Sequence, residues 1–157
     1  RYLLDGLTEL GVTVLRNDAR MIAKDSEEIS IVGVDDPQFK KIGEKIDREF
    51  FYRTIHKLVD SKEFTILHSH RPEFYEMYYE SSVNLVLTGH AHGGQVRLPF
   101  VGGLFAPSQG FFPKYDAGVY KEREFAMVVS RGVSDSLMPV RINNSPEVVI
   151  VELLRKY

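Results

Sequence analysis

The sequence predicts an α/β fold, and three features of the chain indicate it. Two short apolar runs, at residues 64–67 and 84–87, have the length and composition of buried strands. Each run ends in a polar loop that contains histidines, and Pro72 is placed to open a helix that reaches about Glu80 between them. In open α/β sheets, ligands bind in the crevice beyond the carboxyl ends of such strands.

The N-terminal part predicts one helix and a strand meander. Leucines recur at helical spacing up to Leu10, and Gly11 follows where a C-terminal cap would lie, so we expect a helix over residues 2–10. Polar turns separate the short apolar runs that follow. These runs predict three strands, at residues 13–15, 21–23 and 29–34.

A long amphipathic helix is predicted from Phe39 to about Ser61, because apolar residues recur there on one helical stripe. Asp35 and Asp36 precede it. Paired carboxylates there could bind metal or transfer protons, but they more often cap a following helix, and we favour the cap. Beyond the histidine loops, a loop rich in Gly, Pro and Phe runs to about Gly118. Two further strands are expected, at residues 125–130 and 148–153.

Composition limits the functions that are open to the chain. Its 157 residues suit one domain or a piece of one, and a chain that starts with Arg inside a helix suggests a truncated protein. The formal net charge of -2 provides no broad basic field, so nucleic acid is not an expected partner. Cysteine is absent, so any metal must be bound by histidine nitrogen and oxygen ligands. No apolar run is long enough to span a bilayer.

Four of the five histidines form two pairs, His68 with His70 and His90 with His92. In an extended segment, residues i and i+2 point to the same side, so each pair could direct two imidazoles at one metal or at adjacent metals. Imidazole is a suitable ligand for Zn, Mn, Fe or Ni. The alternative is that these are ordinary polar residues near strand ends, and the pattern alone leaves both interpretations open. His56 lies near the apolar stripe of the long helix and is expected to be structural.

Other side chains near the histidines have two possible roles. Arg71 and Arg97 could bind a phosphate bidentately, or they could form ordinary surface ion pairs. The loop that begins at Pro99 has more large apolar residues than a solvated loop needs. It therefore either packs under the domain, which we favour, or presents a surface to a lipid-like substrate or a membrane. These apolar residues are Leu104, Phe105, Phe111, Phe112 and Tyr115.

Two segments resemble the last two motifs of the calcineurin-like metallophosphoesterases. One is Ser-His-Arg-Pro-Glu at residues 69–73, and the other is Leu-Thr-Gly-His-Ala-His-Gly-Gly-Gln at residues 87–95, which is similar to the subgroup whose final motif continues as Gly-Gly-Gln. Flanking segments near Gly11, Gly33 and Pro146 are similar to that subgroup as well, so the resemblance covers essentially the whole chain.

The resemblance implies a four-layer α-β-β-α sandwich with two mixed sheets, of which residues 1–157 form the C-terminal portion. It implies hydrolysis of a phosphoester or pyrophosphate bond by a hydroxide held between two metal ions, with Zn, Mn or Fe as cofactors. By the same resemblance His70 and His90 would bind one metal and His92 the other, whereas His68 matches no family ligand. Substrates in the family range from lipid-like and cell-envelope molecules to nucleotides, and relatives with an N-terminal membrane segment raise the possibility of membrane proximity.

The earlier motifs of the family are absent from these 157 residues. Asp-x-His, Gly-Asp-x-x-Asp and Gly-Asn-His-Asp/Glu would supply the bridging Asp, the remaining metal ligands and the leaving-group acid. We therefore expect no catalytic residue in this chain, the missing motifs upstream of Arg1, and an inactive fragment. Two alternatives stay open: a non-catalytic metal-binding domain that uses the three histidines, and a metal-free interaction domain that uses the apolar loop at residues 99–115. The cellular location is left open between the cytoplasm and association with a membrane through an N-terminal segment that is not among these residues.

Overall fold

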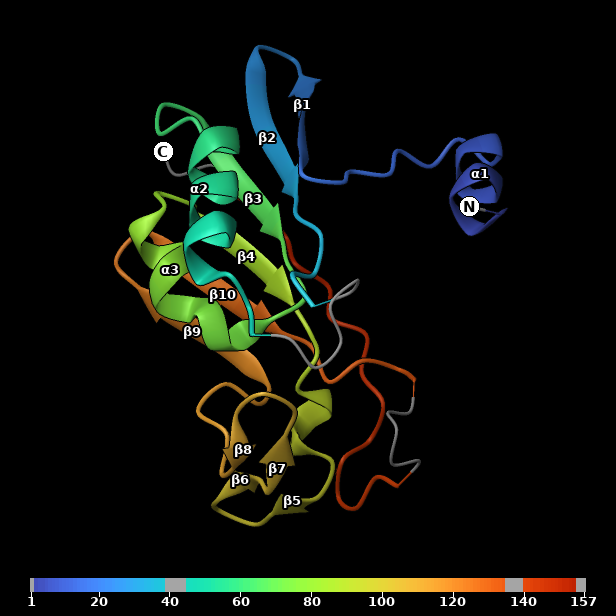
Figure 1. Cartoon of the computed structure of the whole chain (residues 1–157), viewed down its shortest axis with the longest axis vertical. Helices are drawn as coiled ribbons and strands as arrows, with labels where there is room; N and C mark the ends of the chain where they lie inside the picture. Colours follow the sequence, from blue (N-terminus) through green and yellow to red (C-terminus); the bar gives the residue numbers. More distant parts are fainter. Residues whose placement is uncertain (1, 39–44, 135–139, 155–157) are drawn as a thin grey trace.

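The computed structural model describes residues 2–38, 45–134 and 140–154, and in these residues it shows a mixed sheet with helices beside it (Figure 1). The spatial order of the strands is β1-β2-β3-β4-β10-β9. The four inner strands are parallel, and the edge strands β1 and β9 pair antiparallel with their neighbours. The α/β class predicted from the sequence is therefore confirmed. The strands are β1 (Asp18–Lys24), β2 (Glu27–Gly33), β3 (Phe64–His68), β4 (Leu85–Thr88), β9 (Gly118–Glu122) and β10 (Phe125–Val129).

The main core lies between the sheet and two helical segments. These are α2 (Arg48–Leu58) and the continuous pair η1 (Pro72–Phe74) and α3 (Tyr75–Glu80), and in Figure 1 both lie on the same face of the sheet. Alternate strand residues point to opposite faces, so one set packs against the helices. The buried members of this cluster include Val32, Leu67, Val86, Met127 and Val129 from the sheet and Phe51, Ile55, Phe74 and Tyr78 from the helices.

The other face of the sheet carries a second, smaller apolar cluster. Its buried residues are Ile66, Leu85 and Val128. Instead of a helix, the C-terminal segment approaches this face, where Val149 and Val151 line a cavity together with Val128. The chain therefore packs helices on one face of the sheet and an extended segment on the other.

The first helix, α1 (Tyr2–Glu9), agrees with the predicted helix over residues 2–10 but has no buried residue. In Figure 1 it stands apart from the sheet at the end of an extended segment. Gly11 has a φ of 79° and terminates the helix, because its N–H donates to Thr8 and the N–H of Val12 donates to Leu7. The leucine spacing thus correctly predicts a helix with a regular C-terminal cap, but none of the residues of this helix is buried.

The N-terminal half differs from the prediction in one strand, in the start of the long helix and in the residue that caps it. Residues 13–15 form no strand, and β1 begins only at Asp18. The helix predicted from Phe39 does not run unbroken into α2, because residues 45–47 are not helical and residues 39–44 lie outside the described part. Asp47 caps α2 by accepting a hydrogen bond from the N–H of Phe50. The predicted cap on this helix, Asp35 with Asp36, is therefore wrong for α2.

The C-terminal half contains one missed strand and one strand that does not form. β9 was missed because its residues are mostly exposed, and its pairing with β10 across a short turn makes it a strand. Residues 148–153 form no strand, since no strand of the described residues pairs with them. The Pro99 loop contains two small ribbons, which are β5 (Arg97–Leu98) with β6 (Gly102–Gly103) and β7 (Phe105–Ala106) with β8 (Gly110–Phe111). None of the helices found in the described residues is apolar and long enough to cross a bilayer.

Candidate functional site

The two histidine pairs follow neighbouring parallel strands, β3 and β4, so their loops meet at one edge of the sheet. Nδ1 of His90 lies 3.1 Å from Nε2 of His70, and the ring centroids are 4.7 Å apart. An open cavity of about 410 Å³ adjoins His70. It is lined by His68, Ser69, His70, Leu87, Thr88 and Gly89. The structure therefore brings together two of the three predicted ligands, of which His70 lines a cavity.

His90 has the properties of a metal ligand. Its Nε2 atom is buried and has no hydrogen-bond partner within the described residues. Burial, together with the positive charge of Arg71 and the proximity of His70, lowers the pKa of His90 to about 4. The imidazole is therefore neutral at pH 7, and a neutral ring with an unpartnered buried nitrogen fits a divalent transition metal.

His92 is close enough to His90 for the two imidazoles to interact electrostatically. It opens the short helix η2 (His92–Gly94), and within the ranges that the structure describes no set of three His, Cys, Asp or Glu side chains is arranged to hold a metal. The described residues thus provide a pair of imidazoles and no complete metal site. His68, which was not predicted as a ligand, is exposed at the end of β3. His56 contacts the ring of Tyr52 on α2.

The turn that carries His92 has an unusual backbone. His90, His92 and Gln95 have positive φ values of 58°, 48° and 60°, and Gly93 and Gly94 also have positive φ values. Side chains other than glycine rarely adopt this region, so surrounding contacts must hold the turn.

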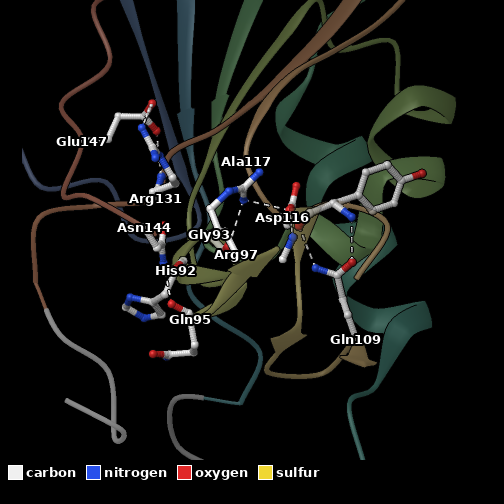
Figure 2. Close-up of polar contacts among 12 residues, drawn as sticks. His92, Gly93, Gln95, Arg97, Gln109, Asp116, Ala117, Arg131, Asn144 and Glu147 are labelled. Carbon is white, nitrogen blue, oxygen red and sulfur yellow. Dashed lines mark hydrogen bonds and ion pairs between the residues drawn. The ribbon is translucent and has the colours of Figure 1, made fainter. Parts of the chain in front are cut away.

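A buried side chain from the C-terminal segment fastens this turn. Nδ2 of Asn144 donates to the carbonyl of His92 at 2.7 Å and to that of Gln95 at 3.1 Å, as Figure 2 shows. Sequence analysis missed Asn144, because it lies about fifty residues from His92 along the chain and no local pattern connects the two. The tertiary structure therefore adds a residue that shapes the loop between the histidines and β5.

Arg97 joins the same turn to the Pro99 loop. Nη1 donates to the carbonyl of Gly93 at 2.9 Å and to Oδ2 of Asp116 at 2.8 Å (Figure 2). The same Asp116 oxygen accepts the N–H of Gly103 at 2.6 Å. Arg97 thus ties two loops together, whereas its contact with a substrate remains a prediction.

Arg71 is buried, with only 4% of its side chain exposed, and lies in a polar network rather than at the surface. Nε donates to Asp36 at 2.7 Å and Nη1 to Glu73 at 3.1 Å. Further bonds go to Gln38 and Ser108. Burial by itself would raise the pKa of Asp36, but hydrogen bonds from Arg71 and Gln38 outweigh it and lower the pKa. The network fixes a buried cation directly after His70, and phosphate binding by Arg71 remains a prediction.

The aromatic residues of the Pro99 loop divide into two groups. Tyr115 is buried and stacks on Tyr75 with ring centroids 4.9 Å apart, which agrees with the packing that we favoured. Phe111 and Phe112 are 71% and 62% exposed, and Phe100 is fully exposed. For Phe111 and Phe112 the packing prediction is therefore wrong, although the ring of Phe111 contacts that of Phe105 edge-on, with centroids 5.4 Å apart.

Comparison with known proteins finds relatives over nearly the whole chain. The chain is 31% identical over 148 residues to a Bacillus subtilis (strain 168) protein named "Uncharacterized metallophosphoesterase YkuE" and 33% identical over 148 residues to "Phosphodiesterase YaeI" of Escherichia coli (strain K12), with 94% of this chain aligned in both cases. It is 34% identical over 158 residues to an Aquifex aeolicus (strain VF5) protein named "Uncharacterized metallophosphoesterase". The aligned regions cover 48%, 50% and 55% of these relatives, so the chain spans about half their length. No family model and no solved structure matches it.

Proposed function

Because the chain belongs to the calcineurin-like metallophosphoesterase family, we propose that the protein containing it hydrolyses a phosphoester or pyrophosphate bond with two divalent metal ions. The observation that carries this proposal is the contact between His70 and His90 at the carboxyl ends of β3 and β4. The buried, unpartnered Nε2 of His90 supports a role for this pair as ligands. The names of the relatives support phosphoester hydrolysis as the reaction class.

In this proposal His70 and His90 bind one metal and His92 contributes to the other. The metal ions, which we propose to be Zn, Mn or Fe, supply Lewis acidity toward phosphate oxygens and a hydroxide nucleophile at neutral pH. The bridging carboxylate, the remaining ligands and the leaving-group acid come from residues outside this chain. We therefore propose that the 157-residue chain by itself is inactive.

The proposed contribution of this chain is to orient ligands and bind the substrate. The low pKa of His90 keeps its imidazole neutral, so a metal does not have to displace a proton from it at pH 7. Arg97 is about one-quarter exposed, so part of its guanidinium could meet a substrate phosphate while Nη1 stays bound to Asp116. Arg71 would act as a buried positive charge behind His70, which attracts an anion without being displaced from Asp36.

We also propose that residues 1–157 are the second half of one domain with the four-layer sandwich. The C-terminal segment supports this, because its apolar residues alternate between two environments. Val149 and Val151 line the cavity on the second face of the sheet, whereas Ile150 points outward with 91% of its surface exposed. A segment that is apolar on both sides is typical of a strand in a sheet that is covered on both faces.

The proposed substrate is a phosphorylated small molecule or a lipid-like molecule. The exposed rings of Phe100, Phe111 and Phe112 support the lipid-like class and proximity to a membrane, because exposed aromatic clusters commonly mark binding surfaces. The lack of a broad positive charge argues against nucleic acid.

The first test is to sequence the reading frame upstream of the codon for Arg1. We expect it to encode the three missing motifs, Asp-x-His, Gly-Asp-x-x-Asp and Gly-Asn-His. Finding none of them would leave a module with histidines alone, and the hydrolase proposal would fail.

The second test measures hydrolysis of bis(p-nitrophenyl) phosphate by the protein from the complete reading frame, with Mn²⁺ or Zn²⁺ added and after chelation. We expect His90→Ala and His92→Ala to lower kcat/KM by at least about a hundredfold, because each removes a proposed metal ligand. His56→Ala is the control, since His56 lies on α2 and contacts Tyr52. Zinc binding that is lost in these variants, without any hydrolysis, would indicate the non-catalytic metal-binding alternative instead.

A further inference from the structure

We infer that Tyr78 is a positioning residue for His70, because its hydroxyl group bonds the residue before His70 and the residue after it. The hydroxyl donates to the carbonyl of Arg71 at 2.7 Å and lies 2.7 Å from Oγ of Ser69. This inference rests on the proposed role of His70 as a metal ligand, and it adds a residue of α3 to the support of that site.

The direction of both hydrogen bonds follows from the chemistry of a phenol. Tyr78 has one hydroxyl hydrogen, and the carbonyl of Arg71 can only accept it. The bond to Ser69 must therefore run from the serine hydroxyl to the phenol oxygen. Burial raises the pKa of Tyr78, which keeps the phenol protonated and able to donate. Both contacts are thus satisfied at once, and both are lost if the hydroxyl is removed.

The ring of Tyr78 is fixed in space. Its side chain is fully buried, and it packs edge-on against Phe51 and Phe74, each with ring centroids 6.5 Å away. These neighbours belong to α2 and η1, which cover one face of the sheet. The hydroxyl therefore holds the backbone around His70 relative to the hydrophobic core, and not merely relative to a mobile side chain.

The carbonyl of His70 is held from the other side. It accepts hydrogen bonds from Oγ1 of Thr88 at 2.9 Å and from the N–H of Gly89 at 3.3 Å, which join it to the end of β4 beside His90. Tyr78 fixes the flanking residues to α3, while Thr88 and Gly89 fix His70 to the neighbouring loop. Loss of the phenol would free one side, so the imidazole of His70 would sample orientations that do not face His90.

The test compares Tyr78→Phe with Tyr79→Phe in the full-length protein. The two variants remove the same atom from adjacent residues of α3, but Tyr79 packs against Phe125 and makes no hydrogen bond through its hydroxyl to the described residues. The first readout needs no metal: the NOE between ring protons of His70 and His90 in the metal-free protein. We expect Tyr78→Phe to weaken this NOE and Tyr79→Phe to preserve it. An unchanged NOE in Tyr78→Phe overturns the inference.

The second readout is the Kd for Zn²⁺, measured well below the unfolding temperature of each variant. Loss of a group that orients a ligand typically weakens metal binding about 10- to 100-fold, so we expect at least about a tenfold increase of the Kd for Tyr78→Phe and none for Tyr79→Phe. A lower Tm with an unchanged Kd would show that the phenol only stabilises the core, and would overturn the inference. If Tyr78→Phe does not fold, Ser69→Ala removes one of the two bonds and is expected to weaken zinc binding in the same direction.

The two proposals fail separately in this design. If His70→Ala leaves zinc binding unchanged, the proposed metal site is wrong, whereas the NOE still decides whether Tyr78 orients His70. If His70→Ala abolishes zinc binding and Tyr78→Phe has neither effect, the metal site stands and the positioning role of Tyr78 is wrong.

Discussion

At the scale of single residues, Arg71 and Arg131 each pair with carboxylates of the same chain, Arg71 in a buried network and Arg131 in a half-buried contact. Arg71 is enclosed by Asp36 and Glu73, and Arg131 bonds Glu147 through Nη2 at 3.1 Å and through its backbone N–H at 3.1 Å. Asp36 and Glu147 are distant in sequence from the arginines that they bind, and Arg71 directly follows the candidate ligand His70. Burial by itself would raise the pKa of Asp36, but hydrogen bonds from Arg71 and Gln38 outweigh it, and hydrogen bonds from Arg131 lower the pKa of Glu147. These two carboxylates therefore make stability depend on pH.

Glu147→Gln tests this dependence. Hydrogen bonds from Arg131 hold the pKa of Glu147 below its ordinary value, so the folded chain releases the proton more readily than the unfolded chain. The contribution to stability is therefore fully present above the unfolded pKa of about 4.3 and is lost as the pH falls through the lower folded value. We expect the free energy of unfolding to decrease less between about pH 5 and about pH 3 in Glu147→Gln than in the wild type, because this interval spans the pKa range of glutamate. Urea unfolding at each pH measures this free energy.

Glu152→Gln is the matched control for this prediction, because Glu152 is an exposed carboxylate on the same segment. It should keep the pH dependence of the wild type. Equal pH dependence in all three proteins would show that the contact between Arg131 and Glu147 does not stabilise the C-terminal segment.

At the scale of elements, the turn η2 depends on close contact between two glycines. Gly94 has a φ of 76°, and a Cβ atom there would overlap with the Cα atom of Gly103 on β6. The backbone of the histidine turn therefore packs directly on the ribbon of the Pro99 loop. This contact explains why glycine is required at Gly94 independently of any metal chemistry.

Gly94→Ala should destabilise the protein by about 2 kcal/mol or more, because it adds a steric clash to an unfavourable backbone conformation. Gly132→Ala separates the two effects. Gly132 has a φ of 68° but open space around an added Cβ. The substitution Gly132→Ala therefore measures backbone strain alone, and we expect it to lower the free energy of unfolding by about 1 kcal/mol. Urea unfolding of both variants measures the difference. If both variants lose the same free energy of unfolding, the turn can move away from β6 without destabilising the protein, and the steric clash at Gly94 does not contribute.

Element prediction succeeded where residues carry a strong local signal. The apolar runs of β3 and β4 and the Pro72 start of η1 were found from the sequence, because burial on both faces and a proline at the first turn leave clear patterns. β9 was missed and residues 148–153 were overpredicted for one common reason. Strand formation requires a partner, and neither the presence nor the absence of a partner is recorded in the local sequence.

At the scale of the whole molecule, apolar surface remains at the C-terminal segment. Ile150 and Leu154 are 91% and 79% exposed, although both have the residue types of a buried strand. The proposed four-layer sandwich would cover these side chains with residues outside this chain. This proposal can be tested without a structure of the complete protein.

Ile150→Lys in the protein from the complete reading frame should lower the Tm by about 6 °C or more, because a buried lysine without a partner costs several kcal/mol. Phe112→Lys is the control, since Phe112 lies on the exposed Pro99 loop and should tolerate a charge. Differential scanning calorimetry measures both variants. A Tm of Ile150→Lys that equals that of the wild type would contradict the proposed second sheet.

The sequence by itself determined the α/β class, the position of the histidine pairs at two strand ends and the family resemblance, because these depend on local periodicity and on short motifs. The tertiary structure decided which histidines meet. It placed His70 against His90, buried Arg71 in a carboxylate network and brought the side chains of Asn144 and Tyr78 into hydrogen bonds with the backbone of the loops. The physical reason is that these contacts join residues far apart along the chain, and only the packing of strands and helices fixes the distances between them.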